Sequence, residues 1–263
     1  MKINDRPIKE YGLFLLQGHS HPSPQVVNKT VKVPGVAGVY HMGSEISSTP
    51  FMLPFGILED NATATQRKLR LFMRECFDEN GNTKPLKIVY DYEPDKYYTG
   101  YVEGLIDVQR LHEYANPMIN ITVPDPFAYS IVSADELTWG NEVITFESYY
   151  LLGHEGTAGM IEVTENTSFN LSVDGYAVKP IIEINGSADD LTVSVGNQSF
   201  SLPQFDGEWE IDSSMYSALY NGQNAFGEYE GDFITLSQGT NEMKINGSNM
   251  DLSIRVKYED RYM

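Results

Sequence analysis

The sequence predicts a mainly β protein with two domains, and three observations carry that prediction. The chain has 263 residues, a length that fits one large or two ordinary domains. Its 22 glycines, 13 prolines and 17 tyrosines are typical of many short strands joined by turns. Short runs alternate apolar and polar residues throughout, whereas one stretch alone has the periodicity of an amphipathic helix.

Residues 85–129 form the centre of the first predicted domain. Their runs of Tyr, Val and Ile suit a pleated, half-buried surface. Glu93, Pro94, Asp95 and Lys96 predict a turn, because proline presets φ and aspartate favours the neighbouring turn position. We therefore expect a meander with strands over residues 86–92, 97–111 and 117–123.

One helix is expected, over residues 65–77. Thr63 followed three residues later by Gln66 fits a capping box at its start. Its apolar side chains fall at the spacing of a single helical stripe. That stripe consists of Leu69, Phe72, Met73 and Cys76. Cys76 therefore reads as a core thiol rather than a nucleophile.

Two segments before the helix have the character of exposed strands. Residues 31–40 contain glycines that punctuate a bend or hairpin. Residues 49–57 are apolar but contain Pro50 and Pro54, which cannot donate to a central ladder. We expect an edge strand there, or a segment that packs against a partner chain.

After residue 129 the sequence predicts a second, all-β domain. We place the boundary so that the domains cover residues 1–135 and 136–263. Residues 191–195 and 198–202 alternate in polarity and are joined by Gly196 and Asn197, a strong hairpin signal. Strands are also expected over residues 181–186 and 252–258. Evenly spaced strands without helices indicate a β-sandwich.

Charge excludes some classes of partner. The net charge is −19, which argues against phosphate contacts to nucleic acid and against an anionic membrane surface. It is compatible with a wall along which DNA passes without sticking. No stretch is long and apolar enough for a membrane span, and the start has no apolar signal region. With one cysteine, synthesis in a reducing cytoplasm is the simplest expectation.

No motif of a known catalytic or cofactor site occurs, so we expect no enzyme activity, cofactor or metal. His19 and His21 could share a metal on one strand face, but they lack acidic or Cys neighbours and fit an exposed loop better. A hydrolase would need paired carboxylates at a defined separation. The sequence offers two adjacent carboxylate pairs, Asp189-Asp190 and Glu259-Asp260, and Glu155 beside His154 as a further candidate acid and base.

Aromatic residues of the second domain leave a further alternative open. Trp209, Tyr216 and Tyr220 could form a platform for a glycan or a partner protein. Trp139 and Tyr229 could contribute to the same platform. Aromatic residues more often fill a sandwich core or a protein interface, so that reading is favoured. The alternative function is therefore a carbohydrate-binding module that acts through the second domain in adhesion to a host cell surface.

The order of these features resembles the distal tail protein of long-tailed, non-contractile (siphovirus-type) phages, including related prophage tail proteins. Each matching segment is short, but together they span almost the whole chain. The first domain contributes residues 33–38, the single helix, residues 86–98 and residues 124–129. The second contributes residues 179–186 and residues 231–241, which are similar to the family pattern G-D-F-x-x-L-x-x-G-x-N.

The resemblance implies a virion structural protein of the baseplate, at the distal end of the tail. It implies an N-terminal β-sandwich or split-barrel-like domain with one helix, and a C-terminal galectin-like (jelly-roll) sandwich. The family forms a hexameric ring that joins the tail tube protein to the tail-associated fibre or lysin protein. In some phages the second domain also carries receptor-binding proteins.

A closed ring needs contacts between two different patches on neighbouring copies. Unpaired strand edges invite such contacts. We therefore expect the ring interface along the two exposed segments, with side chains of Val33, Val36, Tyr40, Phe51, Leu53 and Phe55.

Overall fold

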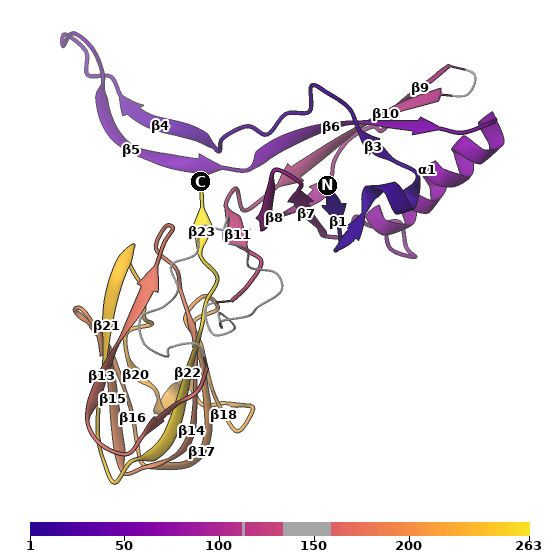
Figure 1. The fold of residues 1–263 in the computed structure, drawn as a ribbon. Helices are drawn as coiled ribbons and strands as arrows, with labels where there is room; N and C mark the ends of the chain where they lie inside the picture. The colour runs from indigo at the N-terminus through magenta and orange to yellow at the C-terminus, as the bar shows by residue number, and fades with distance from the viewer. Residues whose placement is uncertain (112–113, 134–158) are drawn as a thin grey trace. The chain divides into compact units, whose positions relative to one another are not determined.

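The computed structural model describes residues 1–111, 114–133 and 159–263, and it divides the chain into two compact units (Figure 1). The first unit covers residues 1–128 and the second covers residues 129–262. The boundary expected between residues 135 and 136 lies outside the described residues. Both units are built mainly from antiparallel strands, as predicted. No helix among the described residues is long and apolar enough to cross a membrane.

The first unit is organised around one antiparallel sheet in the order β2-β1-β7-β8-β10-β6-β3, with β9 added on β10. A short 3-10 helix, η1 (Ile8–Tyr11), follows β2. The strands are β1 Lys2–Ile3, β2 Arg6–Pro7, β3 Phe14–Leu15, β6 Thr49–Leu58, β7 Leu86–Tyr90, β8 Glu93–Val102, β9 Asp107–Leu111 and β10 Tyr114–Val123.

The predicted helix is confirmed as α1 (Ala62–Cys76), but it begins earlier than expected. Its N-cap is Asn61, whose Oδ1 accepts from Ala64 N at 3.0 Å, so the capping box at Thr63 was wrong. Asn is as good an N-cap as Ser and better than Thr. The apolar stripe packs on the sheet, where Phe72 lies 5.8 Å from Phe55 between ring centroids. Cys76 is fully buried, and burial raises its pKa to about 12.

The meander is confirmed, but its turns differ from the prediction. β7 and β8 pair Tyr90 with Glu93, so the turn is Asp91-Tyr92 and not residues 93–96. The register shifts after Ile88, and Pro94 falls in that irregular part of the ladder, where a missing N–H is tolerated. The expected strand over residues 97–111 is two strands, β8 and β9, both of which pair with β10.

β6 was expected at a sheet edge, yet it lies inside the sheet. It pairs with β10 from Thr49 to Leu58 and with the short β3 on its other side. Beyond β3, the backbone amides of Leu16 and Ser20 donate to the carbonyls of Pro54 and Met52 at 2.9 and 3.1 Å. β3 and residues 16–20 therefore cover the outer edge of β6, which was expected to be a free edge because of its prolines.

The second unit is a sandwich of two antiparallel sheets. The six-stranded sheet has the order β12-β22-β14-β17-β18-β19, and the five-stranded sheet has the order β13-β21-β15-β16-β20. The first sheet comprises β12 Ile161–Val163, β14 Ile181–Ala188, β17 Phe205–Asp212, β18 Ser217–Tyr220, β19 Gln223–Asn224 and β22 Asp251–Lys257. The second comprises β13 Thr167–Val173, β15 Asp190–Val195, β16 Gln198–Leu202, β20 Glu230–Gly231 and β21 Gly239–Ser248.

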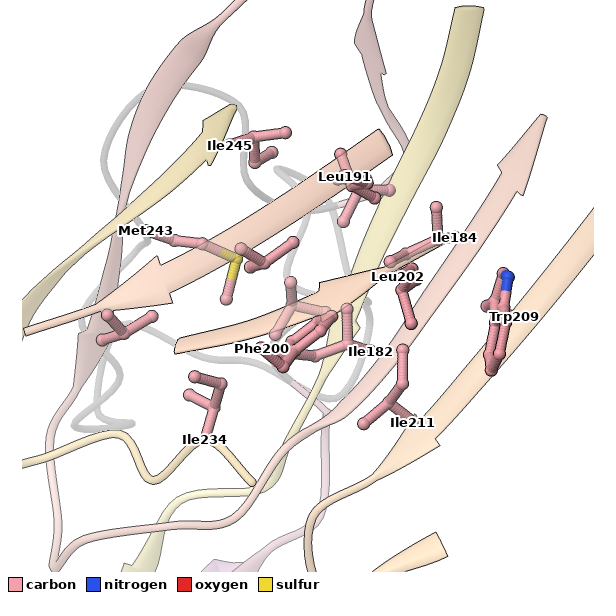
Figure 2. Packing of buried hydrophobic residues seen from close by; sticks show 14 of the residues in the cluster. Ile182, Ile184, Leu191, Phe200, Leu202, Trp209, Ile211, Ile234, Met243 and Ile245 are labelled. Carbon is pink, nitrogen blue, oxygen red and sulfur yellow. The ribbon is translucent and has the colours of Figure 1, made fainter. Parts of the chain in front are cut away.

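The sandwich core collects the inward side chains of both sheets (Figure 2). Phe200, Met243 and Ile245 come from the five-stranded sheet, while Ile184 and Trp209 come from the six-stranded sheet. Each is at most 1% exposed. The alternation predicted from the sequence is thus the alternation of a two-layer sandwich.

The segment that matches the family pattern at residues 231–241 has a structural explanation. Gly231 has φ +125°, and a β-carbon there would lie 2.3 Å from Ser199 O. Ile234 and Leu236 are fully buried, and Asn241 Nδ2 donates to Ser237 O at 2.7 Å. The residues of the pattern therefore allow two strands to approach closely, supply two core side chains, and hold the loop by a side-chain hydrogen bond.

Candidate assembly surface

The most exposed part of the first unit is the hairpin of β4 (Gln25–Val31) and β5 (Tyr40–Ser47), here called the hairpin arm, residues 25–47. β4 and β5 form a separate two-stranded sheet that pairs with no other described strand (Figure 1). Every arm residue except Gly43 and Ser47 is exposed. The glycines predicted to punctuate a hairpin are confirmed at its tip, where Gly35 and Gly38 have positive φ.

The arm exposes many apolar side chains. Polar contacts between its own strands are few: Lys29 pairs with Glu45, and Ser44 Oγ donates to Asn28 Oδ1 at 2.6 Å. A two-stranded ribbon alone is marginally stable in water. Its edges and apolar side chains are therefore suited to contact with another surface. The exposed apolar residues are Val26, Val27, Val31, Val33, Val36, Val39, Tyr40, Met42 and Ile46.

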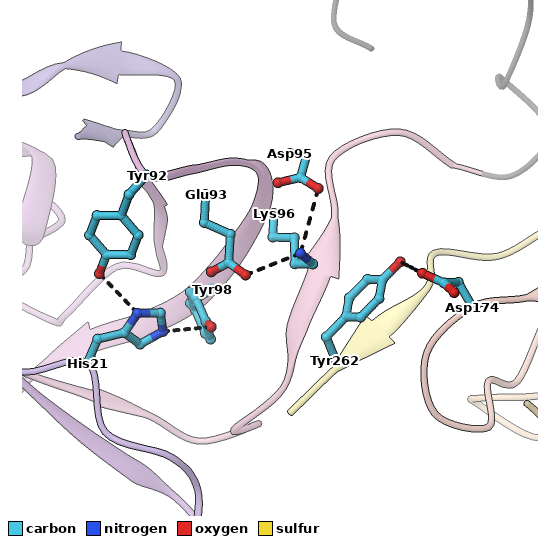
Figure 3. A network of polar contacts seen from close by, with 8 residues as sticks. All are labelled: His21, Tyr92, Glu93, Asp95, Lys96, Tyr98, Asp174 and Tyr262. Carbon is cyan, nitrogen blue, oxygen red and sulfur yellow. Dashed lines mark hydrogen bonds and ion pairs between the residues drawn. The ribbon is translucent and has the colours of Figure 1, made fainter. Parts of the chain in front are cut away.

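The base of the arm is anchored by a cluster that the sequence did not predict. His21 places its Nδ1 2.9 Å from Tyr92 Oη and its Nε2 2.7 Å from Tyr98 Oη (Figure 3). Its ring also stacks on Tyr90, with centroids 4.9 Å apart. Ser20 adds two bonds with the backbone of Met52, one from its amide and one to its hydroxyl. These contacts fix the position of the residues from which the arm begins.

Around His19 and His21, as elsewhere among the described residues, no group of three or more candidate metal ligands occurs. Burial lowers the pKa of His21, an effect that nearby His19 reinforces and Glu93 opposes. A neutral imidazole can accept from one tyrosine and donate to the other. The pair lies in a loop, as expected, and His21 is exposed there, but it also serves as a hydrogen-bonded anchor.

The expected interface residues fall into two groups. Val33, Val36 and Tyr40 are on the arm and are 40%, 45% and 54% exposed. Phe51, Leu53 and Phe55 are at most 1% exposed, so they cannot present side chains to a neighbour and that part of the expectation was wrong. They share one face of β6, and that face packs on the core.

The aromatic residues of the second unit separate in the same way. Trp209 is 1% exposed and lies in the core, so it is not a contact for a glycan or partner (Figure 2). Tyr220 packs against it at 5.2 Å and donates to Asp206 O at 2.8 Å. Of these three candidates, Tyr216 is 57% exposed and Tyr220 is half-buried. Trp139 lies outside the described residues.

The carboxylate pairs considered for hydrolysis have structural partners. Asp189 Oδ1 accepts from Gln204 Nε2 at 3.1 Å. Asp260 is buried and accepts from Asp174 N at 3.2 Å, and burial raises its pKa to about 6. His154 and Glu155 lie outside the described residues.

The negative charge is distributed unequally between the two halves of the chain. Residues 1–133 contain 13 basic and 15 acidic residues, a net charge of −2. Residues 134–263 contain 5 basic and 22 acidic residues, a net charge of −17. Most of the negative charge therefore belongs to the second half of the chain. It does not support the expectation that a ring formed by the first unit has an acidic inner wall for DNA.

Comparison with known proteins agrees with this architecture. Residues 7–123 match the family described as phage tail protein RIFT-related domain. The match covers nearly all of the first unit, including the arm, α1 and the meander. No curated protein sequence matches the chain.

Among solved structures, the chain is similar to the SPP1 Dit (gp 19.1) protein, described as a paradigm of hub adsorption apparatus in phages that infect Gram-positive hosts. The two share 13% identity and a TM-score of 0.70, over 99% of this chain and 98% of the other. The expected resemblance to distal tail proteins is thus confirmed at the level of fold. Chains from the phage P2 baseplate, activated with Ca or Sr, share 10% identity, with a TM-score of 0.46 over 97% of this chain and 93% of theirs.

Proposed function

Because residues 7–123 match the phage tail protein RIFT-related domain family, we propose that this chain is a structural hub protein at the distal end of a phage tail. In this proposal the first unit assembles into a hexameric ring. The second unit is carried by that ring and is available to other tail proteins. The role is architectural and requires no catalytic residue.

The hairpin arm is the observation that carries the proposal. Its apolar residues need a covering surface, and its anchored base fixes the direction in which it leaves the sheet. An arm that lies on the neighbouring copy makes a heterologous contact, and such contacts close into a ring when the rotation permits. Val33, Val36 and Tyr40 are the proposed contact residues.

The proposed ring has two sides for two kinds of partner. We assign one side to the tail tube protein and the other to the tail-associated fibre or lysin protein, with receptor-binding proteins as further candidates on the second unit. DNA would pass through the ring without sequence-specific binding. The location is the virion tail, after synthesis in the host cytoplasm.

The test is the solution mass of the chain over a range of concentrations. We expect a mass of about six chains, or a rise from one chain toward it on concentration. Val36→Asp combined with Tyr40→Asp should hold the chain as a monomer, because each buries a charge in the contact. Met215→Asp is the matched control, since Met215 is 75% exposed on the second unit. A ring unaffected by the arm variant would overturn the role of the arm.

A further inference from the structure

The second unit carries an organised group of aromatic rings at its surface, here called the aromatic patch: Tyr216, Phe226, Tyr229 and Phe233. Phe226, Tyr229 and Phe233 stack with ring planes within 25° of one another. Tyr216 meets Phe233 edge-on, with centroids 5.4 Å apart. Phe226 and Tyr216 are 53% and 57% exposed, so the patch faces solvent.

The patch is held in place by the core beneath it. Tyr229 is 7% exposed, stacks on the core residue Phe200 at 5.3 Å, and donates to Asp232 O at 2.6 Å. Tyr216 has φ +53°, an uncommon conformation for a bulky residue that must be maintained by its surroundings. Rigid aromatic side chains lose little entropy on binding, and they dominate the energetic centres of protein interfaces.

Acidic residues alternate with the aromatic ones along the same segment. Glu228, Glu230 and Asp232 are all exposed, and they lie between Phe226 and Phe233 in the sequence. None of the three has an ion pair within the described part of the chain. Three exposed carboxylates without an ion pair, in the same short segment as the stacked rings, attract a cation.

The patch already binds one cation from its own chain. Lys179 donates to the hydroxyl of Tyr216, and its Nζ lies 4.2 Å from the centroid of that ring. The other three rings have no such cation among the described residues. Tyr229 is stacked between Phe200 and Phe233, so Phe226, 53% exposed, is the ring of these three that offers an accessible face to a positively charged group.

We propose that the aromatic patch is the docking site for an arginine-bearing segment of another protein. A guanidinium stacks on aromatic faces while it donates to carboxylates, which matches the alternation of rings and acids along residues 226–233. The whole second unit is acidic, with 17 acidic and 5 basic residues in 159–263, and would draw a basic segment toward the patch. This deepens the proposed function by giving the chemistry of a partner, and it rests on that function only in taking the partner to be a tail protein.

Binding of a short arginine–glycine peptide to the full chain tests the proposal. The matched peptides replace arginine by lysine or by uncharged citrulline. We expect arginine to bind best and citrulline at least about tenfold more weakly, because it keeps the planar shape but loses the charge. Phe226→Ala should weaken binding of the arginine peptide by roughly tenfold. An unchanged circular dichroism spectrum would show that the variant folds.

Two charge variants distinguish specific binding of the peptide at the patch from nonspecific attraction of the peptide to the acidic second unit. Glu228→Gln, Glu230→Gln and Asp232→Asn together remove three charges at the patch. Their control removes three exposed charges from β17: Asp206→Asn, Glu208→Gln and Glu210→Gln. The patch variant should weaken binding by roughly tenfold and the control by much less.

Three results would overturn the proposal. One is equal weakening by the two charge variants. Another is no binding of the arginine peptide at low salt. The third is binding of a cell-wall polysaccharide that Phe226→Ala removes while the peptide does not bind. The solution mass of the same samples reports ring formation separately, so failure of the patch and failure of the ring are distinguishable.

Discussion

The hairpin arm and the sandwich of the second unit solve the same problem in opposite ways. Both are built from strands with β-branched side chains, whose apolar surface is most stable when another layer covers it. In the sandwich, each sheet covers the other, and residues such as Ile182 and Ile245 are fully buried. In the arm, no second layer is present among the described residues, and almost every side chain is exposed. The sandwich is therefore covered within its own unit, whereas the described residues leave the arm of the first unit uncovered.

The largest expected effect is the removal of a core ring from the sandwich. Trp209→Ala should lower the free energy of unfolding of the second unit by about 3–5 kcal/mol, from lost burial and a residual cavity. Phe226→Ala, on the surface of the same unit, should cost less than about 1 kcal/mol. Chemical denaturation measures both. Equal losses would mean that Trp209 is not the core residue described here.

The next effect is the pH dependence of the second unit through Asp260. Burial raises the pKa of this carboxyl from 3.8 to about 6. The folded state then binds a proton more tightly than the unfolded state, so the stabilisation is complete below pH 3.8 and is lost as pH rises through 6. At pH 8 the ionised group would cost at most about 3 kcal/mol, and Asp260→Asn should flatten the dependence. Thermal unfolding at pH 4 to 8 measures it, and a variant with the wild-type slope would exclude Asp260 as the cause.

The first unit should respond to acid in the opposite direction, through His21. Its pKa is lowered in the folded state, so the folded state binds a proton less tightly than the unfolded state. Stability is complete above the unfolded value of 6.5 and falls as pH drops below it. The protection factors of the β7 and β8 amides, which correct the exchange rates for the intrinsic slowing of exchange in acid, should therefore fall on acidification. His21→Gln should remove this response, and His41→Gln on the exposed arm should leave it intact.

The smallest expected effect is on the stability of the arm itself. Val36→Ser should change the free energy of unfolding by less than about 0.5 kcal/mol, because the side chain is exposed and has no partner layer. The same change should weaken assembly measurably, since it removes apolar surface from the proposed contact. Melting curves and solution mass recorded on one sample separate the two. A large loss of stability in a monomeric sample would contradict the exposed arm.

The sequence predicted those elements that a local pattern of apolar and turn residues is enough to specify. The helix around Phe72, the hairpin turned by Gly196 and the strand at residues 252–258 all follow from local patterns. Gly196 has φ +59°, as the first central residue of a two-residue hairpin of this kind requires. Local chemistry was sufficient in these places.

The sequence failed where tertiary contacts decide the outcome. Phe51 was assigned to a surface because residues 50–57 are apolar throughout, so no polar alternation marked its inward face. Trp209 lies between Glu208 and Glu210, and that alternation did indicate an inward face. The bonds of His21 to Tyr92 and Tyr98 join residues more than 70 positions apart, and no local sequence pattern predicts them. Sequence order likewise could not show that residues 16–20 close the outer edge of β6.

Hydrogen exchange of the β4 and β5 amides at low and high protein concentration tests the central claim most directly. The account predicts fast exchange in the monomer, and protection that rises together with the mass of the assembly, because a neighbouring copy covers the arm. Arm amides that are already protected in the monomer, or that remain unprotected in the assembled ring, would contradict it.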